Sequence, residues 1–213
     1  MTKTSTSIKS AALPAETEPE RFDHTSILLH WLTVLLLLAQ FSSASLHEAA
    51  GHHSPLAATI LTVHRSLGAA TLIVVLARLV WRCRFAYLPP FPPSMPRLQQ
   101  SLAKLNEYGL YVLLVLQPVA GLGRELFRGQ PFQLLFWQVP ELFARNPPLR
   151  NFFAAAHEFG AKALLALIVL HVAAALFHRL VLRDGVLHRM LPWRASLDRP
   201  DEAAISSPAY DAE

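Results

Sequence analysis

Residues 21–41 read RFDHTSILLHWLTVLLLLAQF, and from Ser26 onward most of the side chains are apolar. Apolar runs of this kind occur four times, at about residues 26–46, 59–81, 105–123 and 153–181. A helical run of about 20 residues, with a rise of about 1.5 Å per residue, spans the roughly 30 Å hydrocarbon layer of a bilayer. The sequence therefore predicts an all-α integral membrane protein, a bundle of four transmembrane helices.

One membrane domain is expected to span residues 25–194. The flanking segments, residues 1–24 and 195–213, lack apolar periodicity, which predicts disordered tails. Four of the five prolines in YLPPFPPSMP, residues 87–96, are paired, which predicts an extended connector between the second and third helices. The segment between the third and fourth helices mixes aromatic residues with Pro and Arg, and we expect it at the outer membrane interface.

Basic residues indicate the orientation of the bundle. With the N-terminus in the cytoplasm, the first outer loop, residues 46–58, has no Lys or Arg, whereas Lys and Arg recur in every cytoplasmic segment. The positive-inside rule then places both termini in the cytoplasm, although the second outer loop carries four arginines. The formal net charge of +4 is explained by this topology and by anionic inner-leaflet lipid, with no nucleic acid as partner.

A cleaved signal peptide is the alternative interpretation of the first apolar run, because Ser42–Ser45 supply small residues near its end. The run is longer than a typical signal core, which favours a transmembrane helix.

Four histidines lie inside the predicted helices, at positions where an imidazole in lipid is costly and therefore indicates function: His30, His64, His157 and His171. The first helix runs outward and the second and fourth run inward. His30 is therefore expected near the cytoplasmic face, and His64 and His157 near the outer face. His171 follows His157 by about four helical turns on the same face, which places it at the cytoplasmic level. The sequence predicts an outer pair, His64 with His157, and an inner pair, His30 with His171.

Two imidazoles that face each other across a bundle, with no acidic or thiol ligand beside them, suit the two axial positions of a haem iron. The chain has a single cysteine, Cys83, and no C-x-x-C-H motif, so covalent haem attachment is excluded. The sequence therefore predicts two b-type haems, each with two histidine ligands.

His178 lies seven residues beyond His171 on the same face and is the alternative inner ligand. Pairing through His178 would separate the two layers by about 31 Å, the full hydrocarbon thickness, so His171 is the better candidate. We expect His178 at the membrane edge, near a haem propionate or a quinone. Arg65 and Arg78 are candidate partners of haem propionates, although either could instead extend to lipid phosphates.

Two other interpretations of the histidines remain open. They could be separate polar residues that hydrogen-bond between helices. They could also line a pathway in a non-redox metal or proton carrier, because His47, His52 and His53 in HEAAGHH, with Glu48, could bind a metal weakly. The role of Lys162 within the fourth apolar run is unassigned.

Five motifs occur in order along the chain: LLHW, VHRSLG, LQPVAGL, AHEFGAKALLALIVLHVAAALFH and DGVLHRMLP. Together they resemble the prokaryotic cytochrome b561 family over about residues 20–194. The resemblance implies a four-helix dihaem b cytochrome of the bacterial inner membrane. It implies axial ligands at His30 and His171 for one haem and at His64 and His157 for the other.

The same resemblance implies electron transfer with a quinone and, as in one characterised member, oxidation of superoxide at the periplasmic face. The protein would then be a superoxide:quinone oxidoreductase. The alternative within the same chemistry is a haem-bearing membrane subunit of a larger dehydrogenase or hydrogenase with a soluble redox partner.

Overall fold

The computed structural model describes residues 21–51 and 54–192. The two predicted tails lie outside the described residues, apart from residues 21–24. Of these, His24 already belongs to the first helix. This helix begins there because the Asp23 carboxylate accepts a hydrogen bond from the Ser26 N–H at 2.9 Å, a typical N-cap.

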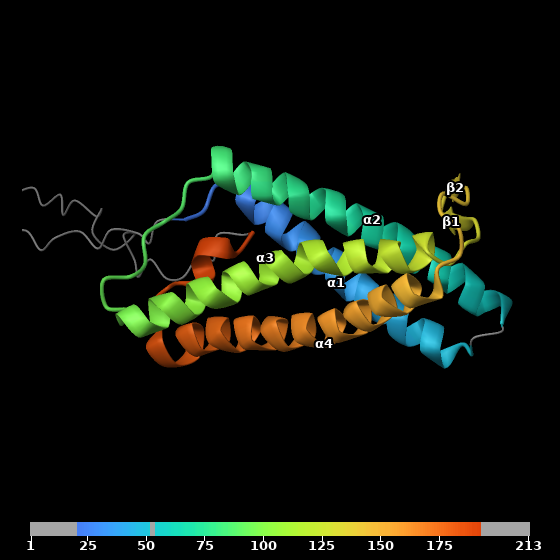
Figure 1. Ribbon diagram of the computed structural model, residues 1–213. Helices are drawn as coiled ribbons and strands as arrows, with labels where there is room; N and C mark the ends of the chain where they lie inside the picture. Colours follow the sequence, from blue (N-terminus) through green and yellow to red (C-terminus); the bar gives the residue numbers. More distant parts are fainter. Residues whose placement is uncertain (1–20, 52–53, 193–213) are drawn as a thin grey trace, which may run out of the picture.

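Four long helices make up most of the described chain: α1 (His24–Ala49), α2 (Pro55–Arg84), α3 (Arg97–Leu126) and α4 (Pro147–Phe177). Each is long and apolar enough to cross a membrane. The predicted all-α, four-helix membrane fold is therefore confirmed (Figure 1).

The first three helices extend beyond the predicted apolar runs at both ends, and α4 does so at its start. At its other end α4 stops at Phe177, four residues before the predicted end at residue 181, and the chain continues as a π-helical turn. Ser54 and Asn146 cap α2 and α4, and a proline follows each cap in the first turn, where its missing N–H costs nothing. The difference is largest in α3, which begins at Arg97, about two turns before the predicted start at residue 105. Prolines prevent a helix only as far as Pro96, and the polar residues that follow are good helix formers.

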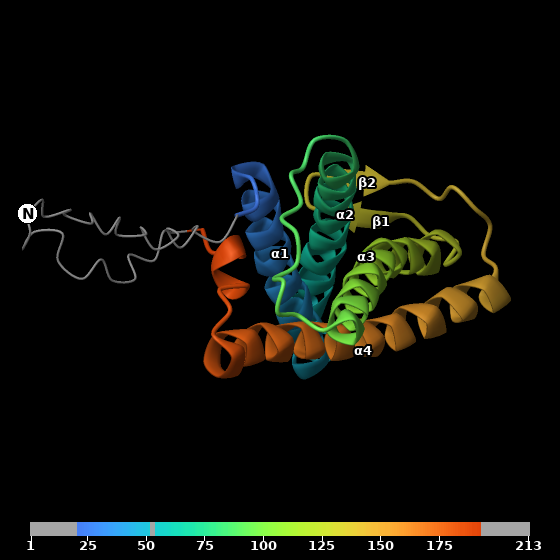
Figure 2. The same cartoon turned by 90° about the vertical axis from the view of Figure 1, so that its left-hand side faces the viewer.

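Packing joins the helices as two pairs. α1 packs along α2, α3 packs along α4, and the pairs meet mainly where α2 contacts α3 (Figure 2). Val75, Leu114 and Leu164 form the buried cluster at the centre of the bundle. The backbones of α1 and α2 approach that of α4 only weakly. The two pairs therefore face each other across a seam in which side chains make the contacts.

A small antiparallel hairpin lies against α2 toward one end of the bundle (Figure 1). Its strands are β1 (Phe132–Leu134) and β2 (Trp137–Val139), and the Leu135 N–H at its tip donates to Ser66 Oγ of α2 at 2.8 Å. The sequence predicts an interfacial loop here and gives no sign of the strands, because strands of three residues are too short to show an alternating pattern.

The two ends of the described chain meet at the opposite end of the bundle, where the Phe22 N–H donates to the Arg189 carbonyl at 3.3 Å, and the connector between α2 and α3 lies at the same end (Figure 1). After α4 the chain forms a π-helical turn, η1 (His178–Leu182), and a 3₁₀ turn, η2 (Leu187–Met190). The Trp31 indole N–H of α1 donates to the Met190 carbonyl at 2.7 Å. Residues at the beginning and end of the described chain therefore lie on one side, and the assignment of that side to the cytoplasm remains a prediction.

Candidate functional site

At the end nearer the hairpin, α2 and α4 bring two imidazoles together. The ring centroids of His64 and His157 lie 6.3 Å apart, and the two ring planes are nearly perpendicular, at 85°.

At the end nearer the chain termini, α1 and α4 do the same. The ring centroids of His30 and His171 also lie 6.3 Å apart, with an angle of 60° between the ring planes. The histidines that were predicted to share a level, from the direction of each helix, are therefore neighbours in the structure.

The geometry of both pairs fits a haem iron. An imidazole nitrogen coordinates a metal ion at about 2 Å, so two imidazoles on opposite sides of one iron have ring centroids about 6 Å apart. The outer pair joins α4 to α2, and the inner pair joins α4 to α1. The backbone of α4 hardly contacts the backbone of either of these two helices. Within the described residues no three His, Cys, Asp or Glu side chains group together as a metal site, so each pair stands without further protein ligands of these types.

Hydrogen bonds orient both imidazoles of the outer pair. His157 Nδ1 lies 3.0 Å from the Gln117 backbone carbonyl, which can only accept, so Nδ1 carries the proton. The Gln117 side-chain amide donates back to the His157 carbonyl at 2.8 Å. His64 Nδ1 lies 2.9 Å from Ser43 Oγ. When Nδ1 is used in this way, the Nε2 lone pair is left for a metal. The sequence analysis did not identify Gln117 or Ser43, because both belong to other helices.

Gly121 of α3 allows His157 to occupy its position. A Cβ atom at residue 121 would lie 3.1 Å from His157 Cε1 and 3.2 Å from Nδ1. This close approach of α3 to α4 holds the imidazole against the α3 backbone.

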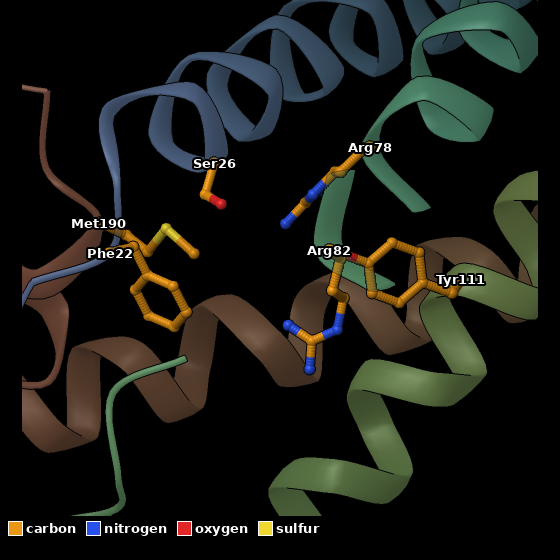
Figure 3. Close-up of a pocket in the computed structure, with 6 residues that line it drawn as sticks. All are labelled: Phe22, Ser26, Arg78, Arg82, Tyr111 and Met190. Carbon is orange, nitrogen blue, oxygen red and sulfur yellow. The ribbon is translucent and has the colours of Figure 1, made fainter. Parts of the chain in front are cut away.

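Arg78 lies beside the inner pair, and Arg82 lies near it. A guanidinium nitrogen of Arg78 lies 3.2 Å from His30 Nδ1. Arg78 and Arg82 both lie over the Tyr111 ring, at 5.3 and 5.8 Å from its centroid. Figure 3 shows the two guanidinium groups extending from α2 toward a small pocket that Ser26, Phe22 and Met190 also line. The two guanidinium groups suit a carboxylate ligand, whereas the Ser26 hydroxyl already donates to the Asp23 carboxylate at 2.7 Å.

Arg65, the other predicted propionate partner, contacts α3 and the hairpin. It forms an ion pair of 2.7 Å with Glu125 of α3, and its guanidinium lies over the Phe132 ring of the hairpin. Arg128 contacts the same Glu125 oxygen at 3.4 Å. The sequence analysis did not identify Glu125, and nothing in the spacing along the chain relates it to Arg65.

His178 lies apart from the inner pair, in its own buried cluster. Its Nδ1 lies 2.5 Å from an Asp184 carboxylate oxygen, and the Gln99 amide lies 3.1 Å from its Nε2. The amide NH₂ is a donor, so Nε2 accepts and Nδ1–H donates to the carboxylate. His178 is thus held at the end of the bundle beside the chain termini.

Two features that the sequence left open now have partners. The Lys162 ammonium pairs with Glu158, one turn earlier, at 2.8 Å on the exposed surface of α4. His47 Nδ1 lies 3.0 Å from the Ala57 carbonyl. His52 and His53 lie outside the described residues.

An open polar pocket of about 350 Å³ lies at the hairpin end of the bundle. Three arginines line it: Arg128, Arg145 and Arg150. A pocket with this charge attracts small anions.

Comparisons with known proteins identify the family. A profile described as prokaryotic cytochrome b561 matches residues 21–193. The chain belongs to the prokaryotic cytochrome b561 family. It is therefore a multi-pass membrane protein, a b-type cytochrome that functions in electron transfer.

Curated relatives cover most of this cytochrome. Cytochrome b561 homolog 1 of Escherichia coli (strain K12) is 27% identical, over 82% of this chain and 98% of the relative. "Probable superoxide oxidase CybB" of Yersinia pestis is 29% identical, over 81% and 97%. Cytochrome b561 homolog 2 of Escherichia coli (strain K12) is 27% identical, over 81% and 92%.

Proposed function

We propose that this cytochrome binds two b haems, one between His64 and His157 and one between His30 and His171, and passes electrons across the bacterial inner membrane. The observation that carries the proposal is the repeated geometry of the two pairs. Both have centroid separations of 6.3 Å, and they occur at two levels of one bundle. If the four histidines were unrelated polar residues between packed helices, the two ring-centroid separations would not be expected to be equal.

Each haem, when bound, supplies reversible one-electron oxidation and reduction. The chain supplies the rest. Four imidazoles hold the two groups at fixed levels, and apolar helix faces keep water away from them. Arg78 is the proposed partner of an inner propionate, because its guanidinium lies beside His30 and lines the small pocket; Arg82 lines the same pocket but also pairs with Glu107 at 2.9 Å.

The orientation follows the positive-inside rule, with the chain termini and the His178 cluster in the cytoplasm and the hairpin in the periplasm. The arginine pocket beside the hairpin would then face the periplasm. This arrangement supports an anionic electron donor at the outer face.

Superoxide is the proposed donor and a quinone the proposed acceptor. Two superoxide anions each lose one electron and become O₂, and one quinone takes two electrons and two protons and becomes a quinol. The relative named as a probable superoxide oxidase and the cationic outer pocket support the donor. His178, buried and hydrogen-bonded at the opposite end, is a candidate neighbour of the quinone.

The ligand assignment is tested by counting haem in the detergent-purified full chain. The pyridine haemochrome assay should give two b haems per chain. His64→Ala and His157→Ala should each lose the same single haem, and His30→Ala and His171→Ala should each lose the other. His178→Ala, the matched control on the same helical face, should keep both.

Other outcomes would favour the alternatives. Absence of a Soret band in protein purified with haem supplied would support a non-redox carrier. Loss of haem in His178→Ala with retention in His171→Ala would reassign the inner ligand. A soluble redox protein that co-purifies in stoichiometric amount, together with no quinol formed from superoxide, would support a subunit of a larger dehydrogenase or hydrogenase.

A further inference from the structure

Ser43 of α1 is a buried polar residue, 6% exposed, that links two hydrogen-bonding groups. Its Oγ lies 2.9 Å from the Gln40 backbone carbonyl and 2.9 Å from His64 Nδ1. A serine hydroxyl has one proton, and a carbonyl can only accept. The hydroxyl proton therefore goes to the Gln40 carbonyl, and the Ser43 oxygen accepts the Nδ1–H of His64.

The Gln40 side chain holds this arrangement in place. With the amide oriented so that its oxygen accepts from the Gly68 N–H at 2.8 Å, its NH₂ donates to the His64 carbonyl at 3.0 Å. The NH₂ also lies 3.0 Å from His64 Nδ1 and could donate only to an unprotonated Nδ1, whereas an imidazole that binds iron through Nε2 keeps its proton on Nδ1. A Cβ atom at residue 68 would come within 3.0 Å of this amide, so the glycine allows α1 and α2 to approach at this point.

The direction of the hydrogen bond affects the metal that Nε2 binds. An imidazole that donates its Nδ1–H to an acceptor becomes a more basic ligand at Nε2. A more basic ligand stabilises ferric iron more than ferrous iron, so the midpoint potential of the haem falls.

The inner pair has no equivalent at His30. The group beside His30 Nδ1 is the Arg78 guanidinium, which has donors only. Among the described residues no carboxylate forms an ion pair with Arg78, whereas Arg65 near the outer pair is paired with Glu125. The environments of His64 and His30 are therefore chemically different.

We propose that Ser43 is a positioning residue of the outer haem, which lowers the midpoint potential of that haem by accepting the Nδ1–H of His64. The proposal rests on the proposed function, because it needs His64 to be an axial ligand. A lower potential makes the outer haem the stronger reductant and favours electron movement toward the inner side.

The test is a spectroelectrochemical titration of the purified full-length cytochrome, with haem content measured first. In Ser43→Ala, one of the two Nernst components should shift to higher potential while the other stays. The reduced-to-oxidised ratio of that haem at fixed ambient potential should rise by up to about tenfold, or about 59 mV for a one-electron couple. Ser43→Thr keeps the hydroxyl and should restore the lower potential.

Thr71→Ala is the matched control, because Thr71 is also buried and, among residues 21–51 and 54–192, its hydroxyl bonds only to the Leu67 carbonyl, at 2.7 Å. This substitution should leave the midpoint potentials of both haems unchanged. If Ser43→Ala loses the outer haem, Ser43→Cys is titrated instead. A thiol is a weak acceptor, so a smaller upward shift is expected.

The outcomes separate the two proposals. A wild-type chain without two haems would refute the proposed function. Two haems with both potentials unchanged in Ser43→Ala, or in Ser43→Cys if alanine loses haem, would overturn the role of Ser43 and leave the ligand assignment standing. A shift of equal size in Thr71→Ala would overturn it as well.

Discussion

Arg65 of α2 and Glu125 of α3 form an ion pair of 2.7 Å in which the side chains are only 13% and 11% exposed. The pair crosses the main contact between the two halves of the bundle, where α2 meets α3. Arg128 adds a second cation to the same carboxylate oxygen. This carboxylate therefore ties both halves of the bundle together beside the outer histidine pair.

Glu125→Gln should destabilise the protein by about 3 to 5 kcal/mol, because it leaves a buried guanidinium without its counter-charge. Thermal unfolding in detergent measures the loss. Glu107→Gln is the matched control on the same helix, since its pair with Arg82 is more exposed and should contribute about 0 to 1 kcal/mol. Equal losses in the two variants would contradict the structural role of Glu125.

Gly121→Val should displace His157, because even one carbon atom added at residue 121 would lie 3.1 Å from the imidazole. We expect loss of the outer haem and retention of the inner haem, measured by haem content and by the visible spectrum. Gly109→Val on the same helix meets only the flexible end of Leu167 and should keep both haems. Two haems in Gly121→Val would show that α3 does not constrain His157.

Asp23 predicts how stability depends on pH at the end of the bundle beside the chain termini. Burial raises the pKa of Asp23, but hydrogen bonds from Ser26 and from Trp81 outweigh burial, and the pKa lies below its ordinary value of 3.8. The charged form is thus favoured by folding. The charged Asp23 carboxylate therefore contributes to the stability of the folded state above pH 3.8. This contribution is lost as the pH falls through the lower pKa that Asp23 has in the folded state.

We therefore expect the thermal midpoint to fall as the pH is lowered from about 5 toward about 2, and Asp23→Asn to lose part of this dependence. Circular dichroism melts at several pH values measure both. Glu141→Gln, at an exposed loop position, should keep the wild-type profile. An unchanged profile in Asp23→Asn would show that the cap contributes nothing through its charge.

Arg145 and Arg150 should accelerate the reaction with superoxide, if superoxide is the donor, by raising its concentration at the outer pocket. Replacing both with Gln should slow haem reduction by roughly tenfold at low salt and flatten the dependence of the rate on ionic strength. Stopped-flow absorbance measures the rate. Replacement of Arg84, at the opposite end of α2, is the control. The idea fails if the double variant keeps the wild-type rate and salt dependence.

Properties that are local to one helix could be read from the sequence. The lengths of the apolar runs predicted four membrane helices, and the helical rise placed His157 and His171 four turns apart on one face. The partner of Lys162 was also readable in principle, because Glu158 precedes it by one helical turn.

Helix ends were less predictable. The start of α3 at Arg97 depends on polar residues that are helix formers but not apolar, and the hairpin at residues 132–139 is stabilised by its contact with Ser66. Neither feature has a hydropathy signal.

The sequence by itself determined the fold class, the levels of the four histidines and hence which of them could pair. Only the tertiary structure decided what surrounds each pair: Ser43 at His64, Gln117 at His157, Arg78 at His30, and Glu125 at Arg65. The physical reason is that depth along a helix follows from the constant rise per residue. Contacts between helices depend instead on how each helix is rotated and packed against its neighbours, and residues far apart in the chain set that together.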